Sequence, residues 1–187
     1  TLCMAEELIS KGEQYTIEGY VHRGEMVVYG AVASVREPNG HTFARYQYPA
    51  DLPRETVARM EEIAGRIIGR IGYDNCPFNM EFFLEPETGD LHVLEMNSRM
   101  SQSHSDLFNK VDGQPHQVLA VELALGRTPR WRRGAGPFGV AAKCFVRRWE
   151  DGVARRVPGE RQIAALGAEQ PETMVEVKVT EGQRLSE

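Results

Sequence analysis

Hydrophobic and polar residues alternate along two early segments, residues 14–21 and 25–35, and both segments are rich in β-branched and aromatic side chains. This alternation is typical of β-strands with one buried face. The intervening His-Arg-Gly at 22–24 suits a tight turn. The pattern therefore predicts a β-hairpin, followed after a Pro-Asn-Gly turn at 38–40 by a short strand over residues 41–48.

A helical period of three and four residues replaces the alternation after Pro53. Proline is favoured in the first turn of a helix, and the apolar positions that follow it fall on one helical face. Gly72 then provides a residue suited to a helix C-cap. A second helical period covers residues 114–125 and stops at Gly126. We therefore expect an amphipathic helix over residues 53–71 and a second helix over residues 114–125.

The pattern changes again beyond Pro137, where short strand-like runs are separated by Asp-Gly, Pro-Gly and Glu-Gly pairs. Together with a second predicted hairpin over residues 76–97, this order of elements indicates the α+β class. We expect residues 1–130 to form an antiparallel sheet with flanking helices. Residues 131–187 are expected to form a β-rich C-terminal extension.

The second hairpin is predicted to consist of strands 76–85 and 91–97 around a Glu-Thr-Gly loop at 87–89. A three-residue loop of this kind, with its glycine at positive φ, would pair Pro86 with Asp90. A bulge in either strand would shift the register by one residue.

This register sets Glu81 opposite Glu95 and Asn79 opposite Asn97. Like charges that face each other across two strands are unfavourable unless a cation lies between them. Carboxylate and amide oxygens select Mg²⁺ or Mn²⁺, and phosphate oxygens can fill the remaining positions. The patch is therefore either a metal–nucleotide site or an ordinary solvated face of a hairpin.

Composition excludes several classes of function. The chain has 187 residues, of which 41% are hydrophobic, and a formal net charge of −5. Its most basic stretch, residues 127–133, is too short for a nucleic-acid surface. No apolar run reaches the roughly 20 residues that a membrane span needs. Three widely spaced cysteines suit reduced thiols, so we expect a cytoplasmic protein that binds neither nucleic acid nor membrane.

The run LEMNSR at 94–99, preceded by Glu81 and a glycine turn, resembles the signature of the ATP-grasp superfamily. This superfamily includes biotin carboxylase, carbamoyl phosphate synthetase and peptide-like ligases. The resemblance implies that residues 1–130 are the large C-terminal half of an ATP-grasp domain and that ATP and Mg²⁺ (or Mn²⁺) are its cofactors. It implies metal ligands at Glu81, Glu95 and Asn97, and a catalytic Arg99 that contacts the transferred phosphoryl group or the acyl-phosphate.

Weaker matches extend the resemblance to the nucleotide. The opening segment with Glu6 and Ile9 resembles the hinge whose backbone reads the adenine edge, and Glu13 resembles the acid that meets the ribose hydroxyls. Phe83 would lie against the adenine ring. The alternatives are a solvated strand edge for the glutamates and simple core packing for Phe83.

Departures from the carboxylase pattern bear on the reaction. Ser103 stands where biotin carboxylase has a glutamate that serves as base for bicarbonate, and Phe145 stands where it has a catalytic arginine. Arg147, two residues further on, is a candidate replacement. His104 either orients a substrate or makes a local hydrogen bond at a helix start. These departures favour an amine over bicarbonate as the substrate class.

The resemblance thus implies an ADP-forming ligase that activates a carboxylate as an acyl-phosphate for attack by an amine. Its partners would be small-molecule carboxylate and amine substrates, the missing N-terminal half with its lid, and a second copy in a homodimer. Alternatives are bicarbonate activation, as in biotin carboxylase or carbamoyl phosphate synthetase, and a noncatalytic nucleotide-binding module. By itself, the chain is expected to be inactive.

Overall fold

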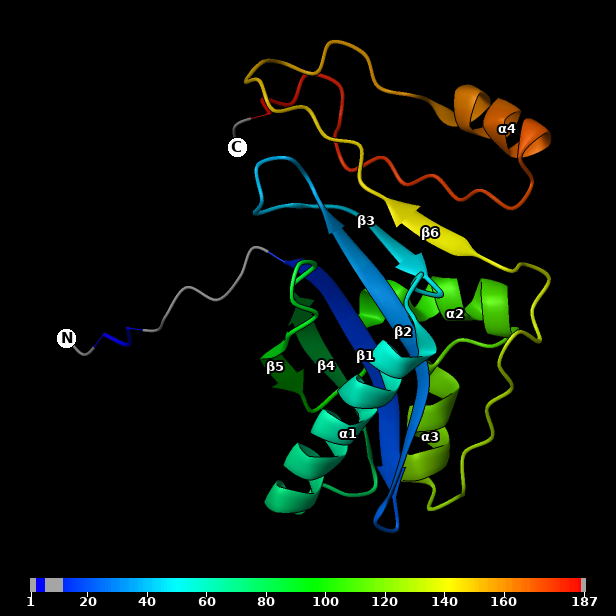
Figure 1. The fold of residues 1–187 in the computed structure, drawn as a ribbon. Coiled ribbons are helices and arrows are strands. Elements are labelled where there is room, and N and C mark those ends of the chain that lie inside the picture. Colours follow the sequence, from blue (N-terminus) through cyan, green and yellow to red (C-terminus); the bar gives the residue numbers. More distant parts are fainter. Residues whose placement is uncertain (1–2, 6–11, 186–187) are drawn as a thin grey trace. The chain divides into compact units, whose positions relative to one another are not determined.

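The computed structural model describes residues 3–5 and 12–185 (Figure 1). Glu6 and Ile9 lie outside the described residues. The chain divides into two compact units, the first ending at Phe145 and the second beginning at Val146. Each unit is therefore described by itself.

The first unit is built on a six-stranded sheet in the order β5-β4-β1-β2-β3-β6, with every neighbouring pair antiparallel. This arrangement confirms both predicted hairpins and the predicted antiparallel sheet. The strands are β1 (Glu13–His22), β2 (Glu25–Arg36), β3 (Phe43–Tyr48), β4 (Cys76–Leu84), β5 (Leu91–Asn97) and β6 (Ala141–Cys144).

The β1–β2 connection is the predicted tight turn. Arg23 and Gly24 both have positive φ, at 55° and 81°. Two-residue turns with this backbone match the right-handed twist of the strands they join. The turn thus places β1 and β2 in register over their full length, apart from a bulge between Glu18 and Gly19.

Helix α1 (Arg54–Ile71) covers one face of the sheet (Figure 1). It ends, as predicted, at Gly72, whose φ is 67° and whose N–H donates to the carbonyl of Ile68. The helix buries Met60, Ala64 and Ile68 in a core cluster with side chains of β1, β2 and β4. Burial of this stripe is the main force that fixes α1 on the sheet.

Two short helices cover the opposite face, α2 (Ser105–Asp112) and α3 (Gln117–Ala124). Helix α3 confirms the helix predicted over residues 114–125, whereas α2 was not predicted. Its eight residues span about two turns, which is too short for a clear period. The helix is held by burial of Leu107 and Phe108 in a second core cluster beneath β2 and β3.

The predicted β-rich extension is wrong for the described residues of the second unit. Between residues 146 and 185 the structure has one helix, α4 (Glu160–Glu169), and one isolated bridge between Val153 and Arg184. The α4 sequence is rich in Ala, Glu, Gln and Arg, which are strong helix formers. The Gly-containing pairs therefore mark loops, but the runs between them do not become strands.

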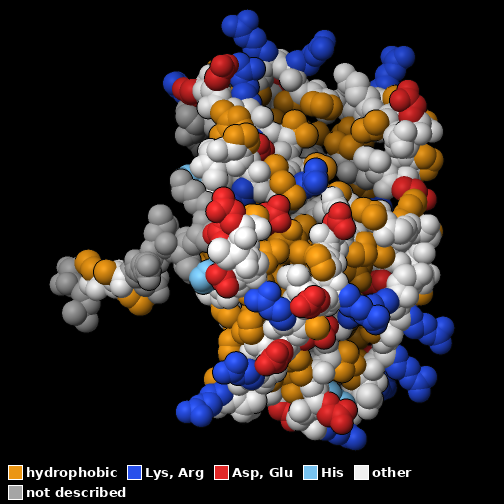
Figure 2. Space-filling model, viewed as in Figure 1, with side chains coloured by type: hydrophobic (Ala, Val, Ile, Leu, Met, Phe, Trp, Pro, Cys, Tyr) orange, Lys and Arg blue, Asp and Glu red, His pale blue; other side chains and the backbone are white. Residues whose placement is uncertain are grey.

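Acidic and basic side chains are interspersed over α1 on the face shown in Figure 2. This distribution agrees with the mixed charge of the sequence. Among the described helices, none combines the length and apolarity that crossing a bilayer requires.

Substitution of Gly19, where the β1–β2 register shifts, should test how tightly strand β1 is packed. A Cβ atom there would lie 2.6 Å from the Val27 carbonyl oxygen and 2.7 Å from the Phe78 ring. Because the oxygen belongs to the backbone, Gly19→Ala should destabilise the fold by about 1–3 kcal/mol. The matched control is Gly69→Ala, since a Cβ on this α1 glycine would meet nothing within 4 Å. It should stabilise the fold by up to about 1 kcal/mol, measured by urea unfolding. Equal effects of the two substitutions would contradict this packing.

Candidate functional site

The β4–β5 hairpin places Glu81 opposite Glu95 and Asn79 opposite Asn97. Residues opposite each other in antiparallel strands project from the same face of a sheet. The two carboxylates and two amides predicted from the sequence therefore do meet on one patch, which we call the carboxylate patch (Glu81, Glu95, Asn79 and Asn97).

The hairpin reaches this register by a different route from the one predicted. The N–H of Glu85 donates to the carbonyl of Asp90 at 2.9 Å, so the predicted pairing of Pro86 with Asp90 is wrong. A register shift between Glu81 and Phe82 then leaves Leu94 as an extra residue on β5. This bulge compensates for the longer turn and restores the pairing of the carboxylates.

Electrostatics at the patch favour a cation. Burial, and next the charge of Glu95, raise the pKa of Glu81. Gln14 Nε2 donates to one Glu81 oxygen at 2.6 Å. Asn97 Nδ2 donates to Glu95 at 2.8 Å and to Asn79 Oδ1 at 3.0 Å, so its own oxygen is the part of the side chain suited to ligate a metal. This donor set of two carboxylates and one amide oxygen fits Mg²⁺ or Mn²⁺.

The donor set is incomplete without a ligand. In the part of the chain that the structure describes, no three His, Cys, Asp or Glu side chains converge as a metal site. Mg²⁺ usually keeps only one or two protein carboxylates and takes its other ligands from water and phosphate oxygens. The patch is therefore suited to a metal nucleotide and less suited to a metal bound by protein alone.

The other predicted site residues differ in whether they lie on the face of the carboxylate patch. Phe83 lies two residues from Glu81 on the same face and directly opposite Gln14. The exposed Arg99 follows β5, and its Nη1 donates to the carbonyl of Met100 at 3.3 Å. Glu13 lies on the opposite face of β1, where its carboxylate accepts a hydrogen bond from Tyr15 at 2.7 Å. The structure therefore does not bring Glu13 to the patch.

The residues at which the sequence departs from the carboxylase pattern have local partners. Ser103 Oγ lies 3.1 Å from Ser101 Oγ. The ring of Phe145 packs edge-on against Tyr46, with centroids 5.4 Å apart. Arg147 belongs to the second unit, so its proposed part in the site stays a prediction.

A buried polar cluster beside the patch was missed by the sequence reasoning. Glu18 on β1 is fully buried, and its Oε1 lies 2.8 Å from His104 Nδ1. Its Oε2 accepts the N–H of Ser101 at 3.3 Å and lies 3.8 Å from His116 Nδ1. The Tyr29 hydroxyl lies 3.1 Å from the same His116 nitrogen. The sequence feature that could have predicted the cluster is the row of alternating polar residues on β1, Gln14, Thr16 and Glu18. Polar residues in a strand inside a sheet are buried and need hydrogen-bond partners.

Burial controls the protonation of this cluster. It raises the pKa of Glu18 well above the ordinary 4.5, and it lowers the pKa of His104 from 6.5 to about 4. Burial, followed by the nearby His104, also lowers the pKa of His116 to about 4. Burial therefore favours the protonated, neutral acid at Glu18 and the neutral imidazole at both histidines.

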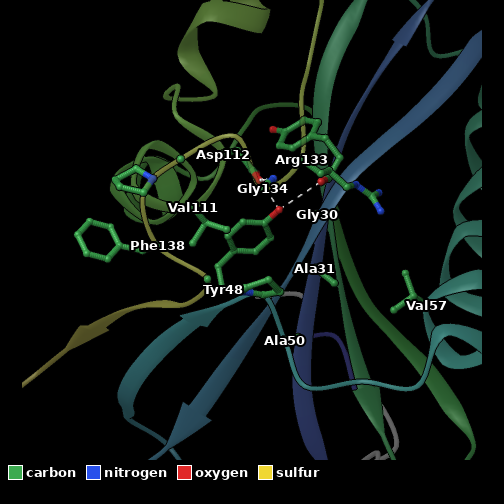
Figure 3. A pocket seen from close by; sticks show the side chains of 15 residues that line it. Gly30, Ala31, Tyr48, Ala50, Val57, Val111, Asp112, Arg133, Gly134 and Phe138 are labelled. Atoms are coloured by element: carbon green, nitrogen blue, oxygen red, sulfur yellow. Dashed lines mark hydrogen bonds between the residues drawn. The ribbon is translucent and has the colours of Figure 1, made fainter.

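A pocket of about 450 Å³ lies elsewhere, lined in part by Tyr48, Asp112 and Arg133 (Figure 3). The Tyr48 hydroxyl donates to Asp112 at 2.7 Å, and the N–H of Gly134 donates to the other Asp112 oxygen at 2.6 Å. Trp131 Nε1 donates to Asp112 as well, at 3.2 Å. Because these donors satisfy the carboxylate, Asp112 holds the 131–134 segment in place, and the pocket is not our candidate site.

Comparison with known proteins supports the resemblance to the ATP-grasp superfamily independently of the site geometry. Residues 48–130 match the family model of the carbamoyl-phosphate synthase L chain, ATP binding domain. The carbamoyl phosphate synthase large chain of Kineococcus radiotolerans is 34% identical over 131 residues, which are 68% of this chain and 12% of that protein. The Bifidobacterium animalis protein is 40% identical over 128 residues, which are 67% of this chain and 11% of that protein.

Solved structures agree on the fold. Campylobacter jejuni biotin carboxylase, in complex with a β,γ-ATP ligand, aligns with a TM-score of 0.61 and 20% identity over 74% of this chain and 31% of that chain. The biotin carboxylase domain of Hydrogenobacter thermophilus 2-oxoglutarate carboxylase, with MgADP, ADP and bicarbonate, aligns with a TM-score of 0.59. It is 20% identical over 74% of this chain and 30% of that chain.

The chain belongs to the ATP-grasp superfamily. The resemblance inferred from Glu81 and the 94–99 run is thus confirmed. This ATP-grasp chain spans less than an eighth of the length of the curated relatives described above. In the superfamily, ATP and Mg²⁺ are the expected ligands of the domain.

Protonation of Glu18 predicts an unusual pH dependence of stability. Because the folded state keeps a proton that the unfolded Glu18 loses above its ordinary pKa of 4.5, this residue lowers stability as pH rises. Glu18→Gln mimics the protonated acid and removes this contribution. As pH rises above 4.5, the free energy of unfolding of the variant should increase relative to that of the wild type, by up to about 1.4 kcal/mol per pH unit, measured by urea unfolding.

The control is Glu25→Gln at the exposed start of β2, which should show no such gain. The two histidines act in the opposite direction, because their pKa values of about 4 cost stability as pH falls from 6.5. They are present in both proteins and cancel in the comparison. A Glu18→Gln variant less stable than wild type by a constant amount at every pH would show that Glu18 is ionised.

Proposed function

We propose that this chain is the metal–ATP-binding part of an ADP-forming ligase that activates a carboxylate as an acyl-phosphate for attack by an amine. The observation that supports this proposal most directly is the opposition of Glu81 and Glu95, with Asn97 beside them, on one face of the sheet. Two facing carboxylates are stable there when a dication with phosphate ligands lies between them.

Glu81, Glu95 and Asn97 would hold the magnesium ions of MgATP. When bound, Mg²⁺ neutralises charge on the phosphates during transfer. Arg99 would contact the transferred phosphoryl group and stabilise its charge. A substrate carboxylate oxygen attacks the γ-phosphorus as the bond to ADP breaks; the amine then attacks the acyl carbon, loses a proton and releases phosphate.

Phe83 is proposed to lie against adenine, since it shares the Glu81 face. The hinge roles of Glu6 and Ile9 and the ribose role of Glu13 rest on the resemblance alone. Mn²⁺ is a second suitable metal. The amine and carboxylate pockets would lie partly in the N-terminal half of the enzyme, which would also supply the lid over the phosphates.

Bicarbonate activation is the second candidate, because the curated relatives are carbamoyl phosphate synthases and a structural neighbour binds bicarbonate. The local structure favours an amine ligase. Ser103, in place of the carboxylase base, is bonded to another serine, and Phe145, in place of its arginine, packs on Tyr46. A noncatalytic module is less favoured, since a scaffold has no need for two facing carboxylates. Cytoplasmic location and homodimer formation remain proposals.

The isolated chain should bind nucleotide weakly and only with a divalent metal, because it supplies metal ligands without a lid. Loss of the free Mn²⁺ signal in electron paramagnetic resonance, titrated with and without ADP, measures this directly. Glu95→Gln should weaken Mn²⁺–ADP binding at least tenfold, while Glu25→Gln at the start of β2 should not change it. Micromolar ATP binding without metal would contradict the proposed ligands.

In the full-length protein, Glu95→Gln should abolish ADP release, whereas Ser103→Ala should keep substantial activity. Replacing a carboxylate by an amide removes a negative charge beside the metals, at a cost of several kcal/mol of transition-state stabilisation. Within the described part of the site, no neighbouring base activates the Ser103 hydroxyl. Ser103 should therefore not serve as the catalytic base.

The measurement is a coupled ADP-release assay with pooled carboxylates and amines. If Ser103→Ala were as inactive as Glu95→Gln, Ser103 would be a catalytic group. ADP release that depends on bicarbonate and not on an amine would refute the ligase assignment.

A further inference from the structure

The central strand β1 has polar residues where a core strand normally has apolar ones. Gln14, Thr16 and Glu18 alternate along the face that α2 and α3 cover, and all three are buried. Gln14 is accounted for by its bond to Glu81. Glu18 makes no such bond to the carboxylate patch, and burying an acid costs several kcal/mol unless its bonds are satisfied.

Glu18 holds both ends of one turn. Its two oxygens contact the Ser101 N–H, at 3.3 Å, and the His104 imidazole, at 2.8 Å. These residues flank the short 3₁₀ turn Gln102–His104, for which Ser101 is the N-cap. A single buried side chain on β1 thus attaches the start and the end of this turn to the sheet.

Asn79 on β4 is directly opposite Glu18. It contacts the backbone just before the turn, at Arg99. Its Nδ2 donates to the carbonyl of Arg99 at 3.0 Å. The backbone is therefore held at Arg99 by Asn79 and at Ser101 by Glu18. Because Glu18 and Asn79 are cross-strand partners, the β1–β4 register sets the spacing of the two attachment points.

We propose that Glu18 and Asn79 form a clamp that positions Arg99 for phosphoryl transfer. This inference rests on the proposed function, because it takes the catalytic role of Arg99 from there. The Arg99 guanidinium donates to the carbonyl of Met100 at 3.3 Å, and this carbonyl lies in the backbone that Asn79 and Glu18 hold on either side. A displacement of about 1 Å at such a group can cost on the order of 100-fold in rate.

The clamp explains why an acid is used at position 18. An apolar side chain of similar size would fill the space and can be as stabilising as a buried polar network. It could not accept the Ser101 N–H or contact His104. Glu18 is thus a positioning residue, whose loss should reduce turnover more than nucleotide binding.

The test is steady-state kinetics of ADP release by the full-length protein. Glu18→Met should lower kcat about 10–100-fold and leave KM for ATP within about threefold, because the residues of the patch are unchanged. Glu18→Gln keeps an acceptor for Ser101 and should recover most of kcat. Asp112→Asn controls for general destabilisation, since this buried carboxylate lies outside the site; it should lower Tm without a comparable loss of kcat.

A second pair of variants covers the case in which Glu18→Met does not fold. Ser101→Pro deletes the N–H donor and leaves Glu18 in place, and the Ser101 φ of −85° is close to that of proline. Ser101→Ala keeps the N–H and should be at least tenfold more active than Ser101→Pro.

Hydrogen exchange of the Ser101 amide tests the contact without any activity. In the 187-residue chain, exchange should be at least tenfold faster in Glu18→Met than in Glu18→Gln. Unchanged exchange, or a Glu18→Met enzyme with kcat within twofold of wild type, overturns the clamp. A Glu18→Gln variant as inactive as Glu18→Met also overturns the clamp. Glutamine keeps the acceptor for Ser101, so the enzyme would then require the acidic proton of Glu18 and not its contact with Ser101. Failure of the ligase proposal is distinct, because the wild type itself would then release no ADP or would release it with bicarbonate and without an amine.

Discussion

The cross-strand register of β1, β4 and β5 is the constraint on which the candidate site depends. One row across the sheet joins Thr16, Glu81 and Glu95, and the next joins Glu18, Asn79 and Asn97. A slip of one residue in β4 would turn Glu81 and Asn79, its members of the two rows, to the opposite face. The apolar face prevents this slip, because α1 packs against Phe78, Met80 and Phe82, which alternate with Asn79 and Glu81.

Two kinds of carboxyl group result from this arrangement, and burial separates them. Glu81 and Glu95 face each other at the accessible end of the rows, where repulsion can be relieved by a dication. Glu18 lies one strand further into the sheet and is fully buried, where burial raises its pKa and favours the neutral acid beside His104. The same residue type thus serves for charge at one position and for hydrogen bonding at the other.

The likeness to carboxylases and carbamoyl phosphate synthases agrees with this division. The fold is shared with solved biotin carboxylase structures, and the sequence relatives place the chain in the ATP-grasp superfamily. The positions at which the sequence departs, Ser103 and Phe145, lie outside the two rows and contact their own neighbours. Substitutions at these two positions can therefore occur without changing the strand register that forms the carboxylate patch.

Local pattern determined much of the fold. The strands of both hairpins, helix α1 with its Gly72 cap and helix α3 were all predicted, because strand alternation and helical period arise from neighbouring residues. Helix α2 and the helical character of α4 were missed. The first is too short to show a period, and the turn pairs around the second suggested strands.

By itself, the sequence determined that Glu81, Glu95 and Asn97 would share a face, since side-chain direction follows from alternation within each strand. Only the tertiary structure decided that β1 lies between β4 and β2, which converts Glu18 from one half of a solvated alternation into a buried group. The bulge at Leu94 was likewise set by packing and turn geometry together. Burial of a residue depends on which strands and helices come to lie beside it, and those contacts join segments far apart in the chain.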